Sequence, residues 1–198
     1  GACQVRRRPP APAARPEEAE HPEERGLESG LESGVQIART DGLRLERLGP
    51  DSPHLLTLAR WEYAQWGHHD PGRRLDEALG EFRGQCGEEG VPSVFVVLDG
   101  DTPVGMASLI VDDMRDRLDL TPWLASVYVR PQWRGRGIAS RLVRRVEEEA
   151  RMHGVERLYL FTQDRQPLYR RLGWQALEEA DYRGERVTIM VKRLPAAE

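Results

Sequence analysis

The sequence predicts an α/β (α+β) domain built on a twisted, mixed sheet of six to seven strands with helices on both sides. Two observations support this class. Apolar runs of strand length alternate with amphipathic stretches of helix length, and one long helix stands between two buried strands. A strand–helix–strand unit of that kind joins parallel strands, whereas short turns elsewhere in the chain indicate antiparallel neighbours.

Residues 1–40 predict a disordered or loosely ordered extension, which leaves 41–198 as the folded domain. The extension holds 5 of the 14 prolines, has no aromatic residue, and contains a short tandem repeat at 26–34. Such a stretch cannot bury enough apolar surface to offset the conformational entropy that ordering would remove. The rest of the chain is long enough to bury a proper core.

The first half of the domain predicts a strand, two helices and a hairpin. Residues 43–48 alternate apolar and charged side chains, as a strand with one solvent-facing side does. Asp51, Ser52 and Pro53 have the chemistry of a helix cap and first turn. The expected elements, in order, are a strand at 43–48, a helix from this cap to about Trp66, a helix around 75–82, and strands at 94–98 and 104–111 joined by a turn at 99–101.

The second half predicts the long helix and the strands around it. The apolar positions of 137–153 form one stripe at helical spacing, which identifies an amphipathic helix. The expected elements are a buried strand at 124–129, this helix, a strand at 157–161, a short helix at 167–172, and a closing antiparallel pair at 174–178 and 187–193.

The segment 129–139 joins a strand directly to the long helix and has the chemistry of an anion-binding turn. Gly135 and Gly137 allow a tight turn and a close approach of a ligand. The free backbone N–H groups at a helix start and the helix dipole attract negative charge, which Arg134 and Arg136 reinforce. The third glycine of the dinucleotide fingerprint and the Gly-Lys of the nucleoside triphosphate loop are missing. Taken alone, the segment also fits a plain polar loop.

Two motifs together resemble a known family. Arg134-x-x-Gly137-x-Ala139 matches the R/Q-x-x-G-x-G/A acyl-CoA signature of the GNAT superfamily of acetyl-CoA-dependent N-acetyltransferases. The downstream run from Leu168 through Tyr169 to Trp174 is similar to the L-Y-x-x-x-G-F segment of that family. With the order of strands and helices, the resemblance covers nearly all of residues 42–194.

The resemblance implies where acetyl-CoA, the expected co-substrate, would lie. It implies a sheet splayed by a bulge between the strands at 124–129 and 157–161, with the thioester in the gap. Many family members have Asn and Ala where this chain has Thr162 and Arg165, so the chain departs from the family pattern on that side of the pantetheine arm. The implied cofactor-binding residues are Arg134, Gly135, Arg136, Gly137, Ile138 and Ala139 for the pyrophosphate, Val127, Tyr128 and Val129 for the pantetheine arm, and Thr162.

Amide formation also needs acid and base groups. The resemblance places Tyr169 as the general acid that protonates the departing thiolate, although a tyrosine here can also simply pack the short helix. The backbone N–H of Val129 or Tyr128 would polarise the thioester carbonyl. Asp112 and Asp113 follow the third strand on the expected acceptor side, where they would bind a cationic amine and accept its proton. Two solvated loop carboxylates are the simpler reading of that pair.

Aromatic and polar side chains suggest an acceptor pocket. Trp66 and Trp123 are candidates for its walls or for the core, and Ser126 on the fourth strand is a candidate for orienting a water molecule. His68 and His69 predict no metal site, because adjacent histidines are expected to point apart and the sequence shows no cluster that would supply a third ligand.

Composition limits the partners. The net charge of −4 argues against a nucleic-acid-binding face, and no run approaches the roughly 20 apolar residues of a membrane span. Two cysteines without metal spacing fit a reducing, cytoplasmic location. We therefore expect transfer of an acetyl group to a small-molecule or peptide amine in a ternary complex, with a homodimer left open. The alternatives are a non-catalytic acyl-CoA sensor or interaction module, and a nucleotide-binding protein that uses the same turn.

Overall fold

The computed structural model describes residues 42–197, so the predicted extension at 1–40 lies outside the described residues. The element types and their order match the sequence prediction. The elements are β1 (Leu43–Arg47), α1 (Leu55–Trp66), the short 3-10 helix η1 (Gly67–His69), α2 (Leu75–Gly84), β2 (Ser93–Asp99), β3 (Thr102–Ile110), β4 (Trp123–Val129), η2 (Pro131–Trp133), α3 (Ile138–Met152), β5 (Arg157–Thr162), α4 (Gln166–Arg171), β6 (Gln175–Tyr182) and β7 (Glu185–Arg193).

The strands form one mixed sheet in the order β1-β2-β3-β4-β5-β7-β6. All neighbours pair antiparallel except β4 and β5, which flank α3 in sequence and run parallel. This confirms the predicted mixed sheet, with its parallel pair at the strand–helix–strand unit. Among the described residues, no helix is both long and apolar enough to cross a membrane.

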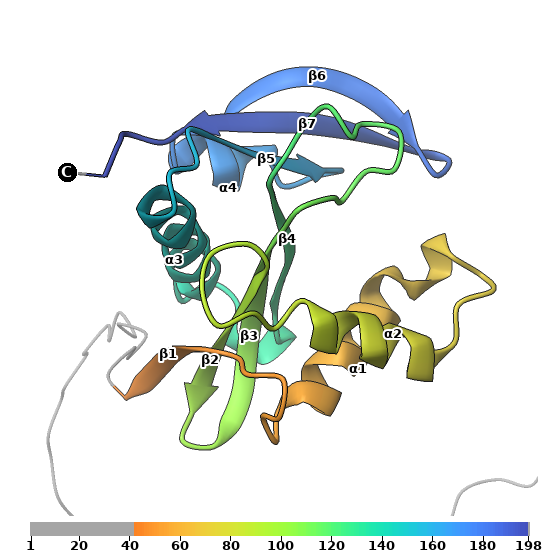
Figure 1. Cartoon of the computed structure of the whole chain (residues 1–198), viewed down its shortest axis with the longest axis vertical. Coiled ribbons are helices and arrows are strands. Elements are labelled where there is room, and N and C mark those ends of the chain that lie inside the picture. Colours follow the sequence, from red (N-terminus) through yellow and green to blue (C-terminus); the bar gives the residue numbers. More distant parts are fainter. Residues whose placement is uncertain (1–41, 198) are drawn as a thin grey trace, which may run out of the picture. The chain divides into compact units, whose positions relative to one another are not determined.

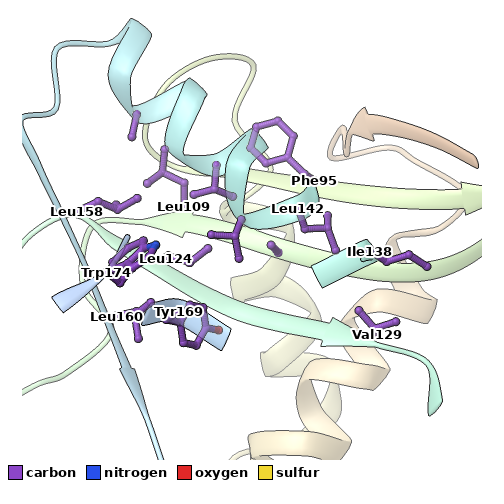
Figure 2. Packing of buried hydrophobic residues seen from close by; sticks show 14 of the residues in the cluster. Phe95, Leu109, Leu124, Val129, Ile138, Leu142, Leu158, Leu160, Tyr169 and Trp174 are labelled. Atoms are coloured by element: carbon purple, nitrogen blue, oxygen red, sulfur yellow. The ribbon is translucent and has the colours of Figure 1, made fainter. Parts of the chain in front are cut away.

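Helices cover both faces of the sheet. In Figure 1, α3 lies on one side of β3 and β4, whereas α1 and α2 lie on the other. The apolar stripe of α3 packs with strand residues and with α4 in one large cluster, part of which Figure 2 shows around Leu142, Leu109 and Leu124. A second cluster joins α1 and α2 to β2 and β3, including Leu58, Phe82 and Met106. The two apolar clusters fix the sheet between its helices.

The start of α1 differs from the prediction. The helix begins at Leu55, its N-cap is His54, and no side chain caps it. Ser52 lies before the helix, where its hydroxyl accepts a hydrogen bond from the His54 backbone N–H at 3.2 Å. The prediction that Asp51, Ser52 and Pro53 form the cap and first turn was therefore wrong. Serine also forms such bonds in isolated turns, and here it does so just ahead of the helix.

β4 and β5 separate soon after they meet. Their register contains one pair, Trp123 with Tyr159. The two strands therefore diverge toward the C-terminal end of β4, and the rest of that edge is free of β5. The sheet is thus split between its fourth and fifth strands, as the resemblance implied.

A bulge interrupts β4 where the split begins. On the β3 side, Ala125 faces Ser108 and Tyr128 faces Met106, so two residues of β4 lie opposite a single residue of β3. Ser126, one of the two, has a φ of 52°, in the left-handed region that non-glycine residues rarely adopt. An extra residue of this kind bends a strand and increases its twist.

The bulge changes which face of the sheet the side chains of β4 occupy. Before it, Leu124 belongs to the cluster on the α3 side, and alternation would place Val127 and Val129 on the opposite face. After it, both valines pack with the α3 side instead. Tyr128 turns toward α1, where its ring lies 5.1 Å from that of Trp61. The bulge therefore directs Tyr128 to the α1 side of the gap.

Candidate active site

The split between β4 and β5 opens into a cavity of about 1140 Å³. This volume exceeds the roughly 300–1,000 Å³ of ordinary small-molecule pockets, so the cavity can hold an extended ligand together with a second molecule. Most of the predicted site residues line it. They are Trp66, Asp112, Asp113, Ser126, Val127, Tyr128, Val129, Arg134, Gly135, Gly137, Ile138, Ala139, Thr162 and Tyr169.

The turn before α3 has the backbone of an anion-binding site. Gly135 and Gly137 have φ values of 74° and 77°, a conformation that favours glycine at both positions. Gly137 is the N-cap of α3, and no side chain caps the helix, so its first N–H groups face the cavity end without a side-chain acceptor. The helix dipole adds positive potential at the same place.

The two arginines of this turn lie differently. Arg134 lines the cavity, and its Nε donates a hydrogen bond to the carbonyl oxygen of Val129 at 3.0 Å. The guanidinium of Arg136 instead lies over the Trp133 ring, 4.6 Å from its centroid, and donates to the carbonyl oxygen of Gln132. Arg136 is not part of the cavity lining. Of the two arginines of this turn, Arg134 is therefore the one whose side chain can contact a ligand in the cavity.

The edge of β4 that faces the cavity can accept another extended chain. Val127, Tyr128 and Val129 line the cavity, and β5 does not pair with them. Backbone N–H and C=O groups at such an edge need partners. An extended ligand with amide groups, such as a pantetheine arm, would satisfy them as an added strand.

Tyr169 lies deep in the cavity wall. Its side chain is 7 % exposed, and Figure 2 shows its ring beside Leu160 and near Trp174, with the two ring centroids 6.1 Å apart. Burial raises the pKa of the phenol to about 12, against a smaller opposing effect of Arg165. At neutral pH the hydroxyl is therefore protonated and able to donate a hydrogen bond into the cavity.

Thr162 helps to set the start of α4, the helix that carries Tyr169. Its hydroxyl accepts a hydrogen bond from the backbone N–H of Arg165 at 3.0 Å. Arg165 is the N-cap of α4. The Thr162 hydroxyl thus holds the cap of α4 and still has a proton to donate toward the cavity.

Two carboxylic acids that influence each other's charge, Asp113 and Glu62, line the cavity. Burial and, to a smaller extent, the negative charge of Glu62 together raise the pKa of Asp113 to about 7, against the opposing charge of Arg183. Glu62, on α1, also has a raised pKa because of burial, although Arg73 at 3.4 Å lowers it. Asp112 is exposed at the rim. Asp113 therefore changes its charge near neutral pH, as a general base should.

Sequence reasoning missed Glu62, which lines the cavity. A signal was present in the sequence. Glu62 stands four residues before Trp66, a spacing that places both side chains on the same face of α1. Trp66 is half-buried, lines the cavity, and also packs against the cluster under α1. Predicting the tryptophan as a pocket wall should have included the glutamate one turn away.

Trp123 does not form a pocket wall. Its side chain is 0 % exposed, it lies outside the cavity lining, and its indole N–H donates to the carbonyl oxygen of Leu120 at 2.7 Å. Its ring packs against Tyr159 and Phe161. The candidate role in acceptor binding is therefore corrected, because its position before the split places it in the core.

His68 and His69 do not point apart, contrary to expectation. Their ring centroids are 3.9 Å apart, and the Nε2 atoms of both approach the carboxylate of Glu185. Adjacent side chains can lie together here because η1 is a single turn of 3-10 helix rather than a strand. All three residues line the cavity.

Known proteins share this architecture. The family model described as the acetyltransferase (GNAT) family matches residues 55–174. An aminoglycoside 6'-N-acetyltransferase complexed with coenzyme A has a TM-score of 0.62 and 16 % identity, and the match covers 78 % of this chain and 99 % of that one. No curated protein sequence matches the chain.

Two bacterial structures give similar values. The yncA protein from Salmonella typhimurium, solved with its cofactor acetyl-CoA, has a TM-score of 0.59 and 18 % identity over 78 % of this chain and 95 % of that one. An acetyltransferase from Streptococcus agalactiae has a TM-score of 0.56 and 19 % identity over 78 % and 99 %. At these identities the structural matches show the fold, while the family model covers more than half of the chain. With its glycine turn, split sheet and matching family model, this chain belongs to the GNAT acetyltransferase family.

Proposed function

We propose that the protein transfers an acetyl group from acetyl-CoA to a primary amine by direct attack within a ternary complex. One observation carries this proposal. A single cavity joins an anion-binding turn, an unpaired strand edge, a protonated phenol and a carboxylic acid whose pKa is about 7. Each of these groups serves one requirement of the reaction. The amine belongs to a small molecule or to a peptide N-terminus.

Acetyl-CoA would occupy the end of the cavity at α3. Its pyrophosphate would bind the N–H groups of the turn at 134–139, with Arg134 beside it. The pantetheine arm would extend along Val127, Tyr128 and Val129, and Thr162 would contact it from the β5 side. Solved structures of family members with coenzyme A or acetyl-CoA support this choice of co-substrate.

The acceptor would enter between α1 and the loop after β3. Asp112, at the exposed rim, would attract the protonated amine. Asp113 would then remove a proton from the nitrogen, and Glu62 beside it supports the raised pKa that suits a base near pH 7. The neutral nitrogen attacks the thioester carbon, the C–N bond forms, and the C–S bond breaks.

Tyr169 would act on the leaving sulfur. Because its pKa is about 12 and that of a thiol is about 8.5, complete transfer of the phenolic proton to a thiolate is unfavourable on its own. The hydroxyl therefore acts first as a hydrogen-bond donor to the developing thiolate. Tyr169 passes its proton to the sulfur only as it receives another proton, either from the solvent or from the reacting nitrogen.

The first test is thermal unfolding with and without acetyl-CoA. At one hundred times Kd, binding adds about 2.7 kcal/mol, which corresponds to roughly 5–10 °C in Tm for a domain of this size. Arg134→Ala should reduce that shift. Arg144→Ala, an exposed residue of α3 outside the cavity lining, is the matched control and should retain it. An absence of any shift with acetyl-CoA or coenzyme A would refute the assignment of the turn.

The second test is turnover with a panel of amines. Tyr169→Phe should retain the acetyl-CoA shift in Tm and lower kcat by about 10²–10⁴-fold, the usual contribution of a positioned acid. Unchanged turnover in this variant would remove Tyr169 from the mechanism. Binding of acetyl-CoA without acetylation of any amine would instead favour a non-catalytic acyl-CoA-binding module.

A further inference from the structure

His68, His69 and Glu185 bring three side chains of metal-ligating chemistry together. The Nε2 atom of His69 lies 3.5 Å from Oε2 of Glu185, and that of His68 lies 4.0 Å from Oε1. One ligand atom from each residue lies within 4.8 Å of the other two. The two histidines come from η1, and the glutamate is the first residue of β7. Figure 1 shows that the connection between α1 and α2 approaches the turn between β6 and β7.

The spacing suits a small divalent ion. Zinc binds nitrogen and oxygen ligands at about 2.0–2.2 Å, which places neighbouring ligand atoms of a tetrahedral site about 3.3–3.5 Å apart. The His69–Glu185 pair already meets that spacing. The His68 side chain is 62 % exposed, so its imidazole has room to rotate toward the other two ligands.

The donor set selects the kind of ion. Two imidazoles and one carboxylate suit zinc and similar transition metals, whereas magnesium and calcium prefer oxygen ligands. Gln163 donates a hydrogen bond to the Glu185 carboxylate and so orients it, as outer partners of metal ligands do. Because all three residues line the cavity, a fourth coordination position would face the acceptor end.

We propose that His68, His69 and Glu185 form a binding site for a zinc-type divalent ion at the acceptor end of the cavity. The ion would tie η1 to the start of β7 and so close the cavity on that side. Its open position would face an oxygen or nitrogen of the acceptor. Without an ion, the same residues would form only histidine–glutamate ion pairs. This proposal goes beyond the proposed acetyl transfer and is tested without turnover.

The test is a calorimetric titration of zinc chloride into the full-length, chelator-treated protein. We expect one saturable site per chain in the wild type and no matching signal with magnesium chloride. His69→Ala and Glu185→Gln should each weaken binding by at least about tenfold, since even an outer partner is worth about 10–100-fold. His54→Ala is the matched control, because His54 lies outside the cavity lining and should retain wild-type affinity.

Cobalt(II) provides a second readout that nonspecific binding of metal to the protein surface would not give. Its visible absorption should report a low-coordinate site in the wild type and should disappear in the His68→Ala/His69→Ala/Glu185→Gln variant. A cooperative thermal unfolding transition shows that each variant is folded. Absence of a saturable zinc site in the wild type would overturn the proposal. So would zinc affinity that is unchanged in the triple variant, which would place the ion elsewhere in the chain.

Discussion

Replacing Asp113 with asparagine should stabilise the protein while it disables the proposed base. The pKa of this carboxyl is about 7 in the folded protein, against 3.8 for the free side chain, a difference of about three pH units. Each unit corresponds to about 1.4 kcal/mol. Above pH 7 the ionised carboxyl therefore lowers the free energy of unfolding by at most about 4 kcal/mol. A neutral amide of the same shape would remove this loss.

The sign of the effect follows from proton binding. Between pH 4 and pH 7, folded Asp113 is protonated while the unfolded side chain is ionised, so the folded state binds the extra proton. Stability contributed by this group therefore falls as the pH rises through that range, and the loss is complete just above pH 7. The wild type and Asp113→Asn should be equally stable near pH 4 and diverge steadily up to pH 7.

Urea unfolding from pH 4 to pH 8 measures this difference directly. At pH 8 we expect the variant to be more stable by up to about 4 kcal/mol, or roughly 10 °C in Tm for a domain of this size. Asp116→Asn is the matched control, because Asp116 is exposed, belongs to the same loop and does not line the cavity. Equal stability of wild type and Asp113→Asn at every pH would refute the buried, high-pKa carboxyl on which the argument rests.

The same variant should lose activity. In the wild type, kcat/KM should rise with pH through about 7 as Asp113 ionises. Asp113→Asn should lower kcat by about 10²–10⁴-fold and abolish that rise. A variant that is more stable but fully active would show that Asp113 is buried without serving as the base.

Two further substitutions test the frame around the site. Gly137→Ala should lower the free energy of unfolding in urea by about 1–2 kcal/mol, because a φ of 77° is strained for alanine; no clash adds to this cost, since no atom lies near the new Cβ. Gly80→Ala, inside α2, should instead stabilise the protein slightly. Equal effects of the two changes would contradict this reasoning. Glu149→Gln should cost about 3–5 kcal/mol at pH 7, since its buried carboxylate contacts Arg47 at 2.5 Å and Arg145 at 2.8 Å. The hydrogen bond that the Gly90 backbone N–H donates to this carboxylate at 2.7 Å, together with the two arginines, outweighs burial and holds the pKa of Glu149 below the usual 4.5. The difference from wild type should therefore shrink as the pH falls below that value; a difference independent of pH would rule out a charge effect.

Much of the fold could be predicted because local patterns encode it. The helix α3 was predicted to within a residue at each end from its apolar stripe. The turn before it was recognisable because glycines and arginines stand together between a strand and a helix. The start of α1 was predicted less well, because a serine that bonds to a backbone N–H resembles a helix cap whether or not a helix follows.

The acceptor end was harder to predict because distant segments build it. Glu185 reaches the histidines only through the pairing of β6 and β7, whose register no local pattern reveals. The sequence left Trp123 as a candidate for a pocket wall or for the core, because it precedes the strand that opens the cavity. Its burial follows from the one point where β4 and β5 still meet, which cannot be located without the bulge.

The bulge at Ser126 makes β4 tolerant of the loss of that one residue, as far as the faces of its side chains are concerned. In a regular strand, losing one residue reverses every later side chain, and a protein usually tolerates such a loss only in a loop. In β4 the bulge already reverses the side chains that follow it, so deleting Ser126 would restore simple alternation. Val127 and Val129 would then stay beneath α3 and Tyr128 would stay beside Trp61, because alternation without Ser126 gives these side chains the faces that they already have. What the surplus residue supplies is therefore the bend and the added twist of β4, and deleting it should close the split while each later side chain keeps its own interior.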